Sequence, residues 1–337
     1  TDTLAGGLGN DTLAGGAAGG PTGGVAPPGT SPAGAGTAPQ TFVPVADAGL
    51  YGAGAGATAD QLGGVDPNQL GTLDKGALGN LAPSAVGTFD ATQVGNLDAT
   101  AVGGLSKDQV AGLNPAALGG FKKDQVAGLD ATAVGGFSKD QVAGLDATAV
   151  GGFNSDQVKA LDPNAMAGFK SDQVAGLDAT AVGGFTAAQM SAFDTAAMAG
   201  FKSDQVASLA PTAMAGFKAD QLGAMDATAM AGFSAAQMTA LDPTAMRGFK
   251  QDQIGAMDAT AMAGFGKDQL AALDPTAMAG FKSDQVAALD AAAMGGFDAA
   301  RMANFAPTAM AGFKSDQIAA LDPTAMAGFK PDQLAAM

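Results

Sequence analysis

The sequence has no cysteine, histidine, tryptophan or glutamate, and it contains a single tyrosine, Tyr51. Proton transfer, thiol chemistry and metal ligation by nitrogen or sulfur normally depend on several of these residue types. The absence of cysteine also excludes a disulfide framework, although it does not fix the compartment, because many bacterial surface proteins avoid cysteine. We therefore expect a protein that is not an enzyme and requires no cofactor.

Positive charge is also scarce. The 32 acidic residues are all aspartates, and 16 basic residues leave a formal net charge of −16. Such a surface repels nucleic acid and anionic lipid. No apolar run reaches the roughly 18 residues that a membrane span needs. We therefore expect neither a nucleic-acid partner nor a membrane-spanning segment.

Glycine is abundant, and residues 1–19 repeat with a period of nine. The stretch GGLGNDTLA, from Gly6 to Ala14, resembles the RTX calcium-binding nonapeptide G-G-x-G-x-D-x-U-x at every specified position. The resemblance implies a parallel β-roll in which the carbonyls of Gly7 and Gly9 and the carboxylate of Asp11 help to hold Ca²⁺. It also implies export by a type I secretion system. The alternative interpretation is a flexible glycine-rich tail of secreted ancestry.

Residues 20–56 are rich in Gly, Pro, Ala and Thr and predict an irregular linker or docking arm. Within it, Thr41–Val45 (TFVPV) is a short apolar patch, which we expect to dock onto the repeats rather than onto a neighbouring molecule. The chain begins at Thr1 rather than at methionine, which suggests a fragment or a processed product.

An eight-residue repeat occupies residues 57–337. It runs for 35 octads from Ala57 to residue 336 without an insertion. Positions one and six of each octad are apolar almost throughout. A continuous helix would drift by about 80° per octad, and a strand would place the two apolar positions on opposite faces. The chain must therefore break and restart in every octad.

Each octad contains its own helix start signals. In LDPTAMAG, from Leu273 to Gly280, Asp274 is a good N-cap and Pro275 suits the first helical position. Leu273 and Met278 predict a hydrophobic staple, and Gly280 is suited to end the turn. Small residues at positions seven and eight would let neighbouring backbones approach closely.

Alternate octads differ, so the chemical unit has sixteen residues. In FSKDQVAG, from Phe137 to Gly144, Ser138 and Gln141 predict a capping box. We therefore expect an all-α solenoid of very short helices, with one helix per octad and two per sixteen-residue coil, preceded by the irregular Gly/Pro-rich arm. Phe, Leu, Val and Met would fill its interior.

Three side-chain rows admit a functional interpretation beside a structural one. The glutamines are either caps or a ligand-binding ladder, and we favour caps. The aspartates are either caps on a solvated surface or a calcium ladder, which alternating lysines such as Lys202 would weaken. The threonines at position four resemble an ice-binding row but can also bond locally. Arg247 and Arg301 are interpreted as surface variation.

An array without insertions suits constant rise and curvature better than a single pocket. The sequence therefore predicts a structural subunit of an extracellular bacterial filament, sheath or matrix that self-associates end to end or laterally. The alternative is the stalk or binding module of a secreted adhesin that presents a repetitive surface to carbohydrate, cells or mineral. Both predict an extracellular or cell-surface location. The array stops at Met337 without a polar cap, so we expect its last coil to stack on another molecule or on further repeats.

Overall fold

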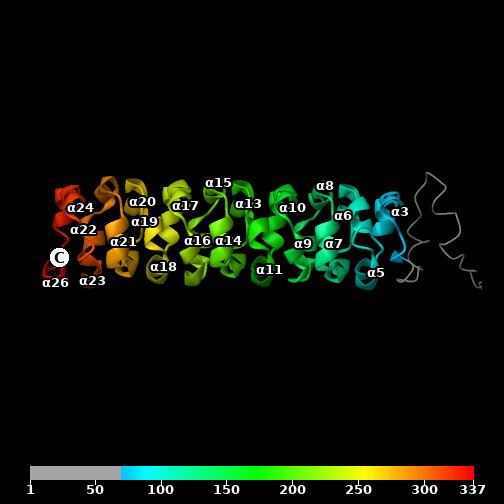
Figure 1. Cartoon of the computed structure of the whole chain (residues 1–337), viewed down its shortest axis with the longest axis horizontal. Coiled ribbons are helices and arrows are strands. Elements are labelled where there is room, and N and C mark those ends of the chain that lie inside the picture. The colour runs from blue at the N-terminus through cyan, green and yellow to red at the C-terminus, as the bar shows by residue number, and fades with distance from the viewer. Residues whose placement is uncertain (1–69) are drawn as a thin grey trace, which may run out of the picture. The chain divides into compact units, whose positions relative to one another are not determined.

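The computed structural model describes residues 70–337, all within one compact unit of the chain. Gly7, Gly9 and Asp11, the arm at 20–56 and the first octads lie outside the described residues. From Leu73 to Ala336 every octad forms one short helix. Figure 1 shows these helices stacked into a solenoid. The predicted all-α solenoid with one helix per octad is confirmed for this part of the chain.

The octads form two alternating kinds, which we name by the residue at position five. Gln octads mostly form six-residue α-helices, and Ala octads form 3₁₀ helices (η) or shorter α-helices. The octad at 297–304 has Arg301 in place of the glutamine and is grouped with the Gln octads.

The helices of the Gln octads are α5 (Ala91–Asn96), α6 (Lys107–Gly112), α7 (Lys123–Gly128), α9 (Lys139–Gly144), α10 (Ser155–Ala160), α11 (Ser171–Gly176), α13 (Ala187–Ala192), α14 (Ser203–Ser208), α16 (Ala219–Ala224), α17 (Ala235–Ala240), α18 (Gln251–Ala256), α20 (Lys267–Ala272), α21 (Ser283–Ala288), α22 (Ala299–Met302), α24 (Ser315–Ala319) and α26 (Pro331–Leu334). Those of the Ala octads are α3 (Lys75–Gly79), α4 (Pro83–Val86), η1 (Ala101–Gly104), η2 (Pro115–Gly120), α8 (Ala131–Val134), η3 (Ala149–Gly152), η4 (Pro163–Gly168), α12 (Ala179–Val182), η5 (Thr195–Gly200), α15 (Pro211–Met214), η6 (Ala227–Gly232), η7 (Pro243–Gly248), α19 (Ala259–Met262), η8 (Pro275–Gly280), η9 (Ala291–Gly296), α23 (Pro307–Met310) and α25 (Pro323–Met326).

The predicted start signals are present in the structure. In the Ala octad at 273–280, Asp274 is the N-cap and accepts a hydrogen bond from the N–H of Thr276, with Pro275 at the first helical position. Leu273 and Met278 are fully buried, as a staple requires. In the Gln octad at 137–144, Ser138 and Gln141 form the predicted capping box. Local sequence therefore sets where each helix begins.

The predicted sixteen-residue coil is wrong. Helix α9 packs against η2 and η4, which lie 24 residues before and after it, and this three-octad spacing recurs along the described array. Glutamine side chains reach carbonyls 28 and 31 residues away, so one turn closes after more than three octads. The physical reason is space, because two helices placed back to back leave no room for two large side chains from every octad.

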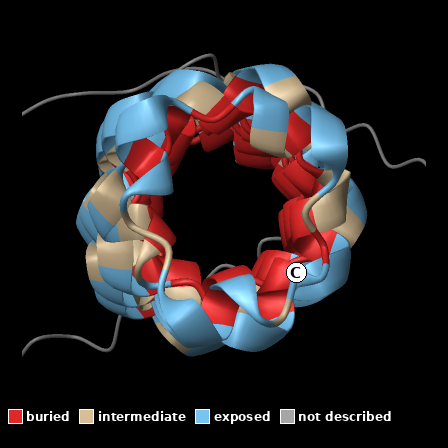
Figure 2. Cartoon of the chain, turned by 90° about the vertical axis from the view of Figure 1, so that its left-hand side faces the viewer, coloured by how far each residue is buried: buried red, intermediate tan, exposed pale blue. Residues whose placement is uncertain are grey.

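The core runs along the solenoid axis. Viewed end on, the buried residues line the inside of the ring and the exposed residues form its outer surface (Figure 2). Position one, exemplified by Phe137 and Leu145, is 2–4% exposed, and position six, exemplified by Val142, is fully buried. The buried side chains form a single cluster from Leu70 to Ala325. Edge-to-face rings such as Phe185 and Phe193, with centroids 5.2 Å apart, are part of it.

The glycine at position eight of the Ala octads has a packing role. A Cβ added to Gly200 would lie 2.0 Å from the carbonyl oxygen of Ser171 in the preceding coil, and one added to Gly280 would lie 2.0 Å from that of Gln251. Gly280 is the last residue of its helix, as expected, and no described glycine has a left-handed φ. The chain leaves this helix through the extended residue Phe281. Close approach of backbones, also predicted, is what these glycines permit.

Candidate functional site

Buried glutamines join successive coils. The Oε1 atom of Gln141 accepts a hydrogen bond from the N–H of Ser138 at 2.8 Å, which closes the capping box. Its Nε2 group donates to the carbonyl of Val110 at 2.7 Å and to that of Leu113 at 2.7 Å, both in the preceding coil. One amide therefore caps its own helix and clamps the coil below. The same cross-coil pair of bonds is made by Gln109, Gln125, Gln157, Gln173, Gln189, Gln205, Gln221, Gln237, Gln253, Gln269, Gln285, Gln317 and Gln333.

The capping half of this role was predicted, but the cross-coil half was not. The signal was present: the side chain recurs every sixteen residues and is never exchanged for asparagine, which is too short to reach the next coil. The backbone–backbone hydrogen bonds outside the helices each span only three or four residues. Polar cohesion between the described coils therefore comes from side chains. Because these amides are buried and bonded, they present no ligand-binding ladder to solvent.

Arg301 stands where the other Gln octads have the buried glutamine. Because its side chain bonds to the preceding coil, its interpretation as surface variation is wrong. Its Nε donates to the carbonyl of Leu273 at 3.0 Å, and its guanidinium also reaches the carbonyl of Ala271. A further nitrogen pairs with Asp298, the N-cap of its own helix. Arg301 thus keeps the bond to the carbonyl 28 residues back, bonds the carbonyl 30 residues back instead of the one 31 back, and adds an ion pair.

Aspartate–threonine pairs stand on the outer surface at the starts of Ala octads. The Oδ1 atom of Asp226 accepts from the N–H of Thr228 at 2.8 Å and from its hydroxyl at 2.7 Å. The hydroxyl bond, followed by the N–H bond, holds the pKa of Asp226 below its ordinary value. The threonine hydroxyl is thus used locally, as the structural interpretation predicted. The same shift of the pKa occurs at Asp98, Asp130, Asp146, Asp178, Asp242, Asp258, Asp274 and Asp322.

The aspartates do not converge. Within residues 70–337 there is no group of three or more acidic side chains placed to hold a metal ion, so the calcium ladder has no geometric basis there. Lysines at position two lie across coils instead: the Nζ atoms of Lys170 and Lys202 donate to the carbonyls of Ala143 and Ala175, each at 2.8 Å. Charged side chains on the outer surface therefore cap helices, as Asp226 does, or bond to the preceding coil, as Lys170 and Lys202 do.

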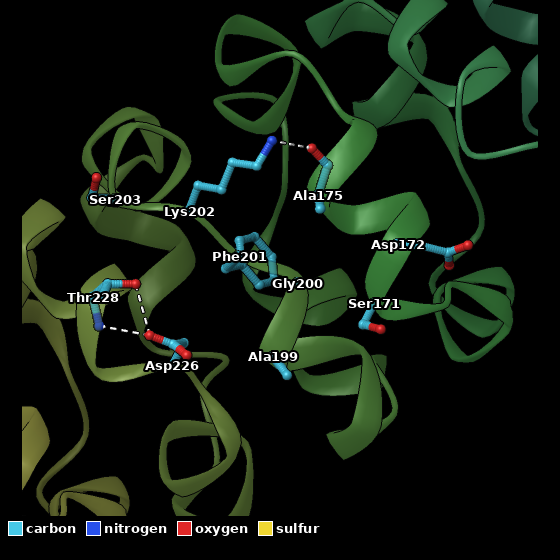
Figure 3. Close-up of a pocket in the computed structure, with 10 residues that line it drawn as sticks. All are labelled: Ser171, Asp172, Ala175, Ala199, Gly200, Phe201, Lys202, Ser203, Asp226 and Thr228. Atoms are coloured by element: carbon cyan, nitrogen blue, oxygen red, sulfur yellow. Dashed lines mark hydrogen bonds between the residues drawn. The ribbon is translucent and has the colours of Figure 1, made fainter.

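Two shallow grooves mark the same place in the repeat. One, of about 550 Å³, lies where Gly200 leads into Phe201, between the coils below and above. The other lies 64 residues earlier, where Gly136 leads into Phe137. Figure 3 shows that Lys202 points across the first groove to the carbonyl of Ala175, whereas Asp226 is bonded to Thr228. The groove repeats, and the charged groups of the first groove are bonded to the protein itself.

The fold and this surface define a helical-repeat solenoid with a closed core and a repetitive acidic exterior. No known protein family matches the sequence, and no curated protein is significantly similar to it. Among the described residues, no helix is both long and apolar enough to cross a membrane.

Proposed function

We propose that the chain is a non-enzymatic structural subunit of an extracellular bacterial filament, sheath or matrix. The observation that carries the proposal is the uninterrupted core: the described octads up to residue 312 each bury an apolar pair at positions one and six, and octads along the array contact the coil three octads away. Such a chain gains length and stiffness with each repeat, but it does not develop one distinct pocket.

The last described coil leaves large apolar side chains exposed. Met326, Leu334 and Met337 are 42%, 55% and 45% exposed, whereas equivalent side chains inside the array are buried. A second copy, or further octads of the same register, would cover them. Assembly end to end would therefore continue the core from one subunit into the next.

Negative-stain electron microscopy of the purified chain tests this function. We expect uniform filaments with a regular axial repeat, growing in number with protein concentration. Isolated rods at all concentrations would contradict the filament. Circular dichroism should accompany the imaging and show helical signal, so that failure to assemble is not confused with failure to fold.

A stalk or binding module of a secreted adhesin is the second candidate, and the repeated groove favours it. Equivalent polar hollows at Phe137 and Phe201 could hold a regularly spaced ligand such as a polysaccharide. Replacing Ser138, Lys139 and Asp162 together should then reduce retention on immobilised polysaccharides. Equal retention of the unmodified chain and the triple variant would remove this candidate.

Calcium and the export route belong to the N-terminal segment in this proposal. Gly7, Gly9 and Asp11 would bind Ca²⁺ only if neighbouring turns completed the site. Calorimetric titration of the full chain with Ca²⁺, compared with Asp11→Ala, tests this site, and the absence of any heat would remove it. Release of the full-length protein by cells with and without a type I secretion system would test the route.

A further inference from the structure

Three stacked helices in the middle of the solenoid have no charged residue in their octads. Helices α13, α15 and α17 belong to the octads at 185–192, 209–216 and 233–240, and each packs on the next. In Figure 1 they lie side by side along one edge of the solenoid. We call their outward faces the charge-free patch. Its exposed side chains are Ala188, Pro211, Thr212, Ala215, Ser234, Ala236 and Thr239.

The patch is a departure from the rest of the described array. All other Gln octads there contain at least one charged residue, commonly a lysine or an aspartate at positions two to four. Single uncharged octads also occur at 81–88, 113–120 and 305–312, but the helices packed on them, such as α6, α9 and α21, belong to charged octads. Only at α13, α15 and α17 do three stacked octads of the described residues lose their charges together.

The loss of charge includes the loss of a helix cap. Most Ala octads begin with an aspartate whose carboxylate accepts a backbone N–H, but α15 begins after Ala210, which makes no such bond. An N-cap of this kind normally stabilises a helix. The chain therefore lacks a stabilising carboxylate at the centre of the patch, as it also does at α4 and α23.

Several hydroxyl groups of the patch are already bonded inside the molecule. Ser191 donates to the carbonyl of Ala188 at 2.8 Å, and Thr239 donates to that of Ala235 at 3.0 Å. Ser234 donates to its capping glutamine at 3.0 Å. Covering these three groups leaves their donors paired, whereas Thr212 lacks the aspartate acceptor of most other Ala octads because Ala210 stands in its place. Desolvation of one neutral hydroxyl still costs less than desolvation of a charged surface.

We propose that the charge-free patch is a lateral interface at which a second copy of this chain docks, with α15 of one copy against α15 of the other. Two chains of net charge −16 repel one another wherever their carboxylates meet. At the patch they can approach without opposing charges, and the small side chains permit close contact. A twofold arrangement places the same surface on both sides. This inference rests on the proposed filament and identifies how filaments would join side by side.

The repeat itself supplies variants that should fold. Aspartate stands at position four of most Gln octads and at position two of most Ala octads, so Ala188→Asp, Ala210→Asp and Ala236→Asp restore residues that the fold accommodates elsewhere. The matched control is Ala306→Asp. Helix α23 has the same sequence as α15 and also lacks a side-chain cap, but it lies outside the patch. Both Ala210→Asp and Ala306→Asp should raise the thermal midpoint through a new cap.

Lateral association is measured by sedimentation velocity and by bundle width in negative stain, from low salt to about 0.15 M, where the Debye length is about 8 Å. For the unmodified chain we expect association to strengthen as salt screens the net charge. The triple variant should weaken lateral association at least tenfold, whereas Ala306→Asp should leave it unchanged.

The outcomes separate the interface from the function. Filaments whose bundling is equal in the unmodified chain and the triple variant would overturn the interface and leave the filament standing. A loss of bundling in Ala306→Asp as large as in Ala210→Asp would also overturn it, because the patch would then have no special role. Filaments of the unmodified chain that stay single at every salt concentration would also overturn the interface. If the unmodified chain formed no filaments at all, the proposed function would be overturned.

Discussion

At the scale of the residue, the buried glutamine contributes most to specificity. It bonds the cap of its own helix and two carbonyls of the coil below, and its side chain is nearly inaccessible. A leucine of similar volume would fill the space but would leave those backbone groups without partners. Buried polar groups that lose their hydrogen bonds cost stability, so an amide is needed at this position.

Replacing one of the buried glutamines that join successive coils should destabilise the array measurably. Gln253→Ala removes bonds to the carbonyls of Leu222 and Met225 and to the N–H of Lys250. Each buried group that loses its partner costs about 1–3 kcal/mol, so we expect the free energy of unfolding to fall by about 2–4 kcal/mol in a denaturant titration. Gln251→Ala, two residues away and exposed, is the control and should change it by less than about 0.5 kcal/mol. Equal effects would contradict the clamp.

Glycine at position eight of the Ala octads should tolerate no larger residue. A Cβ on Gly200 meets three backbone atoms of Ser171 at 2.0–2.9 Å, so Gly200→Ala should cost about 1–3 kcal/mol. Gly119→Ala is the matched control, because a Cβ there would lie 3.6 Å from its nearest atom and alanine stands at that position in other Ala octads, for example at Ala199. Thermal melts should show the larger loss for Gly200→Ala, and the reverse order would contradict this packing.

At the scale of the element, each helix is too short to form alone and depends on its cap and its neighbours. Nine of the described Ala octads use an aspartate that accepts both the N–H and the hydroxyl of a threonine two residues on, as Asp242 does from Thr244. The Gln octads use a capping box that can function even with lysine at the N-cap, because the glutamine supplies the side-chain acceptor. The two kinds of octad therefore begin their helices by different means.

Acid should weaken the Ala octads first. The pKa of aspartates such as Asp242 is lowered in the folded chain, mainly by the hydroxyl of Thr244. Their contribution is therefore complete above the ordinary value of 3.8 and is lost as the pH falls through the lowered folded value. We expect the temperature of the thermal midpoint to decrease once the pH is lowered below about 4.

Asparagine is a control for this titration, because it caps helices well and does not ionise. A variant with Asp226→Asn, Asp242→Asn and Asp258→Asn should lose less of its midpoint between neutral and acid pH than the unmodified chain. If both midpoints fell equally, the caps would not be the source of the acid sensitivity.

At the scale of the whole molecule, the alternation of octads matches the spacing of the coils. Three octads is an odd number, so, apart from the pair of α3 and η1, each helix of one kind packs on helices of the other kind. Each glutamine therefore belongs to a helix that packs on Ala-octad helices in the adjacent coils. The sixteen-residue unit thus maintains this alternation even though it is not the length of a coil.

Deletions distinguish the chemical unit from the octad. Removing residues 265–280, one Gln and one Ala octad, preserves the alternation, and we expect a folded protein with a slightly lower thermal midpoint. Removing residues 273–280 alone deletes half as much chain but reverses the alternation across the junction. We expect the shorter deletion to lower the midpoint more, as measured by circular dichroism. A smaller loss for the shorter deletion would show that alternation is unimportant.

The sequence alone determined the local structure. Caps at Asp274 and Ser138, proline at Pro275 and the apolar pair in each octad specify short helices that start every eight residues, because these effects act within one turn of chain. The capping role of Gln141 was predictable for the same reason.

Tertiary structure decided what depends on distance through space. The coil length follows from the room that Phe137, Val142 and their equivalents need along the axis, and local patterning does not encode that room. The second role of Gln141, the cross-coil bonds of Arg301 and the need for Gly200 likewise depend on backbone 28 to 31 residues away. The stacking of α13, α15 and α17 into one uncharged surface became visible only once the coil length was known.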